Sequence, residues 1–152
     1  MKNLKNYNIK NKKILFRADL NVPLIDGVIT DTSRIQAIKS SIEILISNKN
    51  KIFLMAHFGR PKGKVVEKYS LNFILPSLKE TLNLDKVYFL ENFDQDSVEK
   101  TVNEMQVGNL CLIENIRFLK EEENIDLKFA KKISSLFDVY VNDAFSASHR
   151  NH

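Results

Sequence analysis

Short apolar runs alternate with helix-like segments along this chain of 152 residues. The apolar runs predict five strands, at Lys13–Ala18, Lys51–Ala56, Val87–Leu90, Leu110–Ile113 and Val139–Val141. These runs are apolar almost throughout, which is typical of strands covered on both faces. Strands and helices in this order, joined by right-handed crossovers, predict an α/β fold. We therefore expect a three-layer, mostly parallel open sheet of the Rossmann-like kind, with helices on both faces.

The segments between the strands have the spacing of helices. Asp31 or Thr32 is expected to cap a helix that runs to about Asn48, because its apolar residues recur at intervals of three and four. Further helices are predicted from a cap at Ser70 to about Leu82, from about Asp96 to Met105, and from Asp126 to Leu136. An Asp-Gly turn inside Val22–Ile29 predicts a small hairpin after the first strand.

Composition excludes several classes of protein. Lys and Arg total 23 and Asp and Glu total 19, so the formal net charge of +4 by itself implies neither a nucleic-acid nor a membrane partner. The single cysteine, Cys111, excludes a disulfide framework, and its apolar neighbours predict a buried, reduced thiol. No uncharged apolar stretch approaches the roughly 18 residues that a membrane span needs. Arg17 and Asp19 interrupt the first apolar run, so we expect no cleavable signal and a cytoplasmic protein.

The arginines give the strongest indication of function. Only five of the 23 basic residues are arginine, and Arg34, Arg60, Arg117 and Arg150 each follow a predicted strand. Ligands of open parallel sheets bind beyond the carboxyl ends of the strands, so these four residues are expected to converge on one cleft. Guanidinium groups match the oxygens of phosphate and carboxylate, which predicts a multivalent anion as the ligand. The alternative is four separate surface charges that contribute little.

Residues near the first strand each admit two interpretations. Arg34 lies in the first turn of its predicted helix, where the helix dipole disfavours a cation. A bound anion would explain this position, whereas a solvated side chain would simply tolerate it. Arg17, Asp19 and Asn21 alternate along the chain and so share one face. Either Asp19 and Asn21 hold a ligand hydroxyl, or Asp19 pairs with Arg17 while Asn21 turns the chain.

Two histidine-containing segments are less specific. The run His57–Gly63 follows the second predicted strand, and its two glycines allow the backbone to approach an anion closely, with His57 as a further donor. The same run is also compatible with a solvent-exposed turn and a structural histidine, and it is not a Walker loop. His149 and His152 have a spacing that metals use, but no third ligand accompanies them, so we expect no metal site.

Five segments together resemble the sequence motifs of phosphoglycerate kinase. They are RADLNVP at Arg17–Pro23, DTSRI at Asp31–Ile35, HFGRPKG at His57–Gly63, ENIRF at Glu114–Phe118 and NDAFSASHR at Asn142–Arg150. They occur in the order of the family with plausible spacing, and the resemblance covers nearly the whole chain from about Lys12. The last segment departs from the family, which often has Gly and Thr in place of Ser146 and Ala147.

The resemblance implies reversible phosphoryl transfer between ATP and 3-phosphoglycerate, giving ADP and 1,3-bisphosphoglycerate in glycolysis. It also implies two α/β domains, of which the N-terminal one binds phosphoglycerate and the C-terminal one binds Mg-nucleotide. Carried over by motif, Asp19 and Asn21 would hold the hydroxyl and carboxylate end of the substrate, and Arg34 would be catalytic, steadying the charge on the group in flight. The 3-phosphate would be held by His57, Arg60, Arg117 and Arg150. A monomer is implied, with no nucleic-acid or membrane partner.

Length is the larger departure from the family. Phosphoglycerate kinases are well over twice as long, and this chain stops at His152, inside the last motif. We expect residues 1–152 to be an incomplete N-terminal domain, with the nucleotide-binding domain and its cofactor-binding residues absent. This chain alone would then be inactive, and the alternative function is a non-catalytic fragment that binds phosphoglycerate. A small nucleic-acid binder is a second alternative, suggested by an isoelectric point of about 9.1, but the lysines are dispersed and argue against it.

Overall fold

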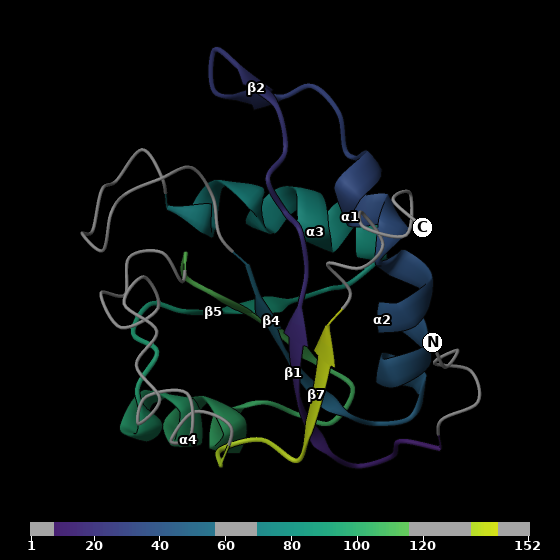
Figure 1. Cartoon of the computed structure of the whole chain (residues 1–152), viewed down its shortest axis with the longest axis vertical. Coiled ribbons are helices and arrows are strands. Elements are labelled where there is room, and N and C mark those ends of the chain that lie inside the picture. The colour runs from purple at the N-terminus through teal and green to yellow at the C-terminus, as the bar shows by residue number, and fades with distance from the viewer. Residues whose placement is uncertain (1–7, 57–69, 116–134, 143–152) are drawn as a thin grey trace.

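The computed structural model describes residues 8–56, 70–115 and 135–142. Within these residues five parallel strands form one sheet in the order β5-β6-β4-β1-β7 (Figure 1). The strands are β1 (Lys13–Arg17), β4 (Lys51–Met55), β5 (Val87–Leu90), β6 (Leu110–Ile113) and β7 (Val139–Asn142). All five predicted strands and the predicted parallel sheet are confirmed, and no strand end differs from its predicted position by more than one residue.

The strands end level with one another at one edge of the sheet. Arg17 at the end of β1 is paired with Met55 of β4 on one side and with Asn142 of β7 on the other. At the far side of the sheet Leu90 of β5 is paired with Ile113 of β6. The segments that follow these strands therefore all leave the sheet from the same edge, which we call the carboxyl edge.

A two-stranded hairpin follows β1, as predicted, and projects beyond the carboxyl edge (Figure 1). It consists of β2 (Leu24–Ile25) and β3 (Val28–Ile29), which pair in antiparallel register. Asp26 and Gly27 form its turn with φ values of 52° and 77°, both in the left-handed region. Aspartate and glycine tolerate this region better than other residues, which is why the Asp-Gly pair predicted the turn.

The helix predicted from Asp31 or Thr32 to about Asn48 is in fact two helices, α1 (Ser33–Ala37) and α2 (Lys39–Ser47). The break falls at Ile38, whose N–H donates to the carbonyl of Ile35 at 3.2 Å, a tighter turn than that of an α-helix. The periodicity did not reveal the break because both isoleucines are buried on the same face. Thr32 makes no side-chain capping bond, whereas the Asp31 carboxylate accepts the Ser33 N–H at 2.8 Å, which lowers the pKa of Asp31.

The predicted cap at Ser70 is confirmed. The Ser70 hydroxyl accepts the N–H of Asn72 at 3.2 Å and opens a 3-10 helix, η3 (Leu71–Ile74), which continues directly into α3 (Leu75–Leu82). Asn83 ends α3 in the left-handed conformation, with φ of 60°. A residue in the left-handed conformation cannot extend a right-handed helix, so it turns the chain away from the helix axis. The N–H groups in this turn donate to the last carbonyls of the helix.

The remaining described helix is α4 (Gln95–Glu104), one residue earlier than the predicted range from about Asp96 to Met105. Asp94 caps it, its carboxylate accepting the N–H of Ser97 at 2.9 Å and the Ser97 hydroxyl at 3.1 Å. The helix predicted from Asp126 to Leu136 lies outside the described residues, except for its last two positions, which form a turn.

Helices cover both faces of the sheet, as predicted. One core cluster joins β1, β4 and β6 to α1, α2 and α3 through side chains such as Ile14, Phe16 and Leu54. The opposite cluster contains Leu15, Phe53 and Cys111 from the same strands, together with Val98 of α4. Neighbouring residues of each strand therefore belong to different cores, which is why the strands are apolar at every position.

The direction of the crossovers explains which helix lies on which face. From β1 the chain moves first to β4 and then past β6 to β5, and the helices on these two connections, α1 to α3, pack on one face. From β5 it turns back to β6 and then passes β4 and β1 to reach β7. In these returning connections α4, Leu136 and Phe137 pack on the other face. A reversal of direction requires a change of face when every crossover has the same hand.

We predict that Cys111 reacts with thiol reagents only when the chain unfolds. The side chain is 0% exposed, and burial raises the pKa of its thiol to about 12. The reactive thiolate is therefore scarce at neutral pH in the folded protein and appears when unfolding returns the pKa to about 8.5. Labelling with a disulfide reagent at pH 8, followed over a urea series, should track the loss of circular dichroism. Rapid labelling without denaturant would contradict the burial of β6 between two helical layers.

Candidate functional site

The chain leaves β1 at the carboxyl edge through a segment that keeps the alternation of a strand. Ala18, Leu20 and Val22 are buried, with exposed fractions of 3%, 0% and 4%. The Ala18 N–H donates to the carbonyl of Met55 at 3.0 Å, so pairing with β4 extends one residue past the strand. Asp19 and Asn21 alternate with the buried residues and are more exposed, as expected of two side chains that share the other face.

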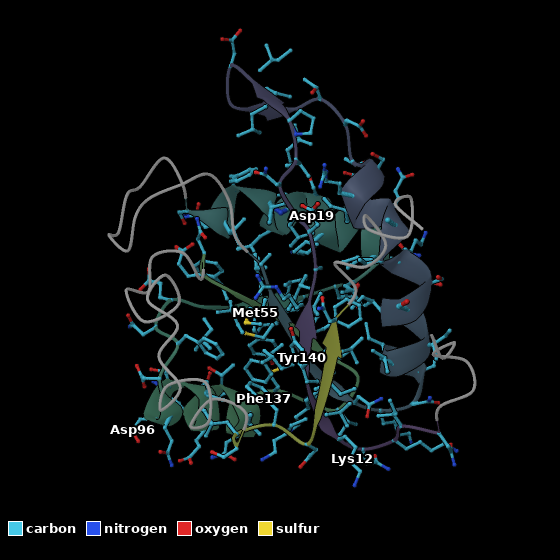
Figure 2. The ribbon with its side chains drawn as sticks, in the orientation of Figure 1. Lys12, Asp19, Met55, Asp96, Phe137 and Tyr140 are labelled. Atoms are coloured by element: carbon cyan, nitrogen blue, oxygen red, sulfur yellow. The ribbon has the colours of Figure 1, made fainter. Side chains whose placement is uncertain are left out.

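The Asp19 carboxylate makes two contacts at this edge. One oxygen, Oδ1, accepts the backbone N–H of Asn21 at 3.0 Å, which fixes the bend that follows β1. The other oxygen, Oδ2, forms an ion pair with the guanidinium of Arg34. Figure 2 shows Asp19 at the carboxyl edge, and Lys12 at the opposite end of β1. The spacing of residues did not predict the Asp19–Arg34 pair, because the hairpin and the start of α1 lie between the two residues.

Arg34 lies at the start of α1, at the foot of the hairpin that brings the chain back to the carboxyl edge. Its guanidinium is paired with the Asp19 carboxylate, an anion supplied by the protein itself. The conflict with a helix dipole that the sequence predicted does not arise, because α1 has only five residues and Arg34 belongs to its last turn as well as to its start. The side chain of Arg34 is 40% exposed and that of Asp19 is 23% exposed, so the pair remains open to solvent and to a ligand. Asp19 and Asn21 of the segment after β1 are thus brought together with Arg34 of α1.

A second polar network at the carboxyl edge centres on Glu114, which follows β6. Its Oε2 accepts the hydroxyl of Ser70 at 2.6 Å, and its Oε1 accepts the N–H groups of Leu71 and Asn115, each at 2.8 Å. Its own N–H donates to the carbonyl of Leu90 at 2.9 Å. Sequence reasoning missed this residue, because Ser70 and Glu114 are 44 positions apart and no local spacing links them. The only signal that could have pointed to Glu114 was the general rule that a negative charge is favourable near the N-terminus of a helix.

The other predicted ligands, His57, Arg60, Arg117 and Arg150, lie outside the described residues, as do His149 and His152. The structure does describe the strands that lead to them. β4 ends at Met55, two residues before His57, and β6 ends at Ile113, four residues before Arg117. Both strands end at the carboxyl edge; β4 is the direct neighbour of β1, which leads to the Asp19–Arg34 pair, and β6 is one strand further away. The convergence of the predicted anion ligands on this edge stays a prediction.

Metal ligands do not gather anywhere in the part of the chain that the structure describes. Within residues 8–56, 70–115 and 135–142, no group of three or more His, Cys, Asp or Glu side chains is placed to hold a metal ion. No helix among these residues is long and apolar enough to cross a membrane.

These features define an open-sheet α/β protein with an ion-paired, partly exposed polar site at the carboxyl edge of its strands. Solved structures of the same architecture include phosphoglycerate kinase from Pyrococcus horikoshii, with a TM-score of 0.81 and 30% sequence identity. The likeness covers 98% of this chain and 38% of that one.

Sequence comparison gives the family. The family model for phosphoglycerate kinase matches residues 4–152. Phosphoglycerate kinase of Finegoldia magna is 45% identical over 153 residues, which cover 99% of this chain and 38% of the relative. The cytosolic phosphoglycerate kinase 3 of Arabidopsis thaliana is 45% identical over 150 residues, covering 98% of this chain and 37% of the relative. The chain belongs to the phosphoglycerate kinase family, and it spans somewhat over a third of the length of these curated relatives.

We predict a small but measurable coupling between Asp19 and Arg34. A double-mutant cycle with Asp19→Asn and Arg34→Ala, measured by urea denaturation, should give a coupling of about 0.5 to 1 kcal/mol, because the pair is only partly buried. The Asp19→Asn substitution keeps a side-chain oxygen that can accept the Asn21 N–H, so the cycle reports the ion pair alone.

The matched control for this cycle is the exposed pair of Lys39 and Glu43 on α2, whose nearest charged atoms are 3.8 Å apart. Its coupling should be smaller, about 0.3 kcal/mol. Equal couplings in the two cycles would show that the Asp19–Arg34 pair is no more than an ordinary surface contact.

Proposed function

We propose that this chain is part of a phosphoglycerate kinase and contributes the site for 3-phosphoglycerate. The complete protein transfers a phosphoryl group reversibly between ATP and 3-phosphoglycerate, giving ADP and 1,3-bisphosphoglycerate in glycolysis. Membership of the family supports the reaction. The share of the relatives that is covered supports the narrower role of this chain, since most of their length, with room for a nucleotide site, lies outside it.

The observation that carries the proposal is the pairing of Asp19 with Arg34 beside Asn21 at the carboxyl edge. A carboxylate, an amide and a guanidinium together provide acceptors for hydroxyl groups and donors for anionic oxygens. A substrate with a hydroxyl, a carboxylate and a phosphate group matches this combination of partners. The edge on which the three residues meet is also the one at which ligands of open parallel sheets bind.

In the proposed mechanism Asp19 and Asn21 hold the hydroxyl and carboxylate end of the substrate. The bend between them is fixed by the hydrogen bond from the Asn21 N–H to Asp19 Oδ1. Each carboxylate oxygen has a second lone pair, so Asp19 can accept a substrate hydroxyl without releasing Asn21 or Arg34. The substrate hydroxyl would therefore enter a site whose acceptor is already oriented.

Arg34 is the proposed catalytic residue, and it acts on the phosphoryl group in flight. A guanidinium has five N–H donors, and the pair with Asp19 leaves others available. Phosphoryl transfer needs charge neutralisation and positioning more than covalent chemistry from the protein. Arg34 would supply both to the oxygens of the transferred group, while Asp19 holds its side chain in place.

The phosphate end of the substrate is assigned to His57, Arg60, Arg117 and Arg150. The three guanidinium groups and the imidazole would neutralise the 3-phosphate, each charge-assisted hydrogen bond contributing about 1.5 to 3 kcal/mol. The sheet supports this assignment by leading β4 and β6 to the same edge as Asp19 and Arg34.

Mg-ATP supplies the phosphoryl group, and we assign its binding to a part of the relatives that this chain does not span. The proposal includes a monomer with no nucleic-acid partner. It also includes a location in the cytoplasm, which the cytosolic relative of Arabidopsis supports. A coupled enzyme assay of the 152-residue chain should accordingly give no ATP-dependent turnover of 3-phosphoglycerate. Turnover by this chain alone would overturn the assignment of the nucleotide site elsewhere.

Calorimetric titration tests the substrate site directly. We predict that the chain binds 3-phosphoglycerate, gives no signal with Mg-ATP, and loses phosphoglycerate binding when Arg34→Ala and Arg117→Ala are combined. Arg117 is assigned to the 3-phosphate, and Arg34 is assigned to the substrate as well as to the transferred group. Removal of these two charge-assisted contacts should weaken binding by at least about a hundredfold.

The matched control is the double variant Lys79→Ala and Lys100→Ala, which removes the same charge from exposed positions on α3 and α4. It should bind as the unchanged chain does, because neither lysine lies at the carboxyl edge. Equal losses in the two double variants would mean that net charge, and not a site, attracts the ligand. Absence of binding by the unchanged chain would contradict the proposed function of these residues.

A further inference from the structure

We propose that Glu114 is a positioning residue for the phosphate end of the substrate site. This inference rests on the proposed function, because it concerns how the sheet edge presents the residues that are expected to hold the 3-phosphate. Glu114 itself is not proposed to touch the substrate. It acts by joining two separate places at which the chain meets the carboxyl edge, one beside Ser70 and the other beside Asn115.

The first place is the start of η3. The segment that carries His57 and Arg60 leaves β4 after Met55 and returns at Ser70. There the Glu114 carboxylate accepts both the Ser70 hydroxyl, at 2.6 Å, and the Leu71 N–H, at 2.8 Å. Both distances are those of strong charge-assisted hydrogen bonds. The end of this segment is therefore fixed to the end of β6.

The second place is the point at which the chain leaves β6. The same oxygen that receives Leu71 also accepts the Asn115 N–H at 2.8 Å, and the Glu114 N–H donates to the Leu90 carbonyl at 2.9 Å. Asn115 is only 1% exposed, so the backbone here is packed as well as hydrogen-bonded. Arg117 follows two residues later. One carboxylate thus fixes the return of the segment with His57 and Arg60 and the departure of the segment with Arg117.

A carboxylate suits this position better than an amide. It must accept three donors, and an ionised carboxyl group has two acceptor oxygens and no donor, whereas one terminal atom of a glutamine is a donor. Its negative charge is also favourable at the N-terminus of η3 and α3. Because the group is only partly exposed, loss of the carboxylate leaves backbone N–H groups without their partner.

The test compares Glu114→Ala and the milder Glu114→Gln with matched variants of Asp94. Asp94 also caps a helix through a backbone N–H and a serine hydroxyl, but it does so at α4 on the opposite face of the sheet. Asp94→Ala and Asp94→Asn therefore control for the loss of a carboxylate cap. Thermal unfolding followed by circular dichroism identifies the variants that fold, and Glu114→Gln serves if Glu114→Ala does not.

The decisive measurement is a ratio of two affinities, determined by calorimetry for 3-phosphoglycerate and by NMR titration for glycerate. Glycerate lacks the phosphate and uses only the end of the site assigned to Asp19 and Asn21. We expect Glu114→Ala to weaken 3-phosphoglycerate binding by about tenfold, Glu114→Gln to weaken it less, and both to leave glycerate binding unchanged. A residue with only a structural role would weaken both ligands in equal proportion, as a partly unfolded chain does.

The outcomes separate this inference from the proposed function. If the unchanged chain binds no 3-phosphoglycerate, the proposed function and this inference both fail. If the unchanged chain binds it and the Glu114 variants keep the same ratio of affinities as the Asp94 variants, only the inference fails. A selective loss of 3-phosphoglycerate affinity in the Glu114 variants supports both.

Discussion

Parallel pairing of β1 between β4 and β7 is the constraint on which the rest of this structure depends. Parallel strands cannot be joined by tight turns, so every connection must cross the sheet and bring the chain back to the same starting edge. The register places the ends of β1, β4 and β7 level with one another. Polar residues that follow different strands are consequently delivered to one edge, whatever their separation in the sequence. The candidate site therefore arises from the pairing of the strands themselves and not from a separate domain.

The two helical layers follow from the same constraint. The chain runs outward from β1 to β5 and then returns to β6, and the covering helices change face when the direction changes. Residues such as Leu15 and Phe16 are therefore buried on opposite faces. Burial on both sides makes the backbone of the sheet rigid, and the chemistry is left to residues beyond the carboxyl edge. This division explains why Asp19 and Glu114 both lie directly after a strand, where a rigid element positions them.

Local sequence patterns predicted the elements well and the contacts between elements poorly. Continuous apolar runs identified the five strands described in the sheet, and the Asp-Gly pair identified the hairpin, because these signals depend on neighbouring residues. The break at Ile38 was missed, since burial of Ile35 and Ile38 on one face preserves the period of an uninterrupted helix. The Asp19–Arg34 pair and the Glu114 network were missed because they depend on how the elements pack. Alternation nevertheless predicted that Asp19 and Asn21 share a face.

The Asp19–Arg34 pair raises the question of why a site proposed to bind an anion should contain a carboxylate. Asp19 reduces the positive charge of the edge, which on its own weakens the attraction of a phosphate. It also restricts the long side chain of Arg34, whose free rotation would otherwise be lost on binding, at a cost of up to about 2 kcal/mol. The pair is partly exposed, so solvent screens its charges and the loss of attraction is modest. Holding the Arg34 side chain in place before binding therefore outweighs the reduction in positive charge wherever the geometry of the bound group matters more than its affinity. Transfer of a group between two molecules is a reaction of that kind.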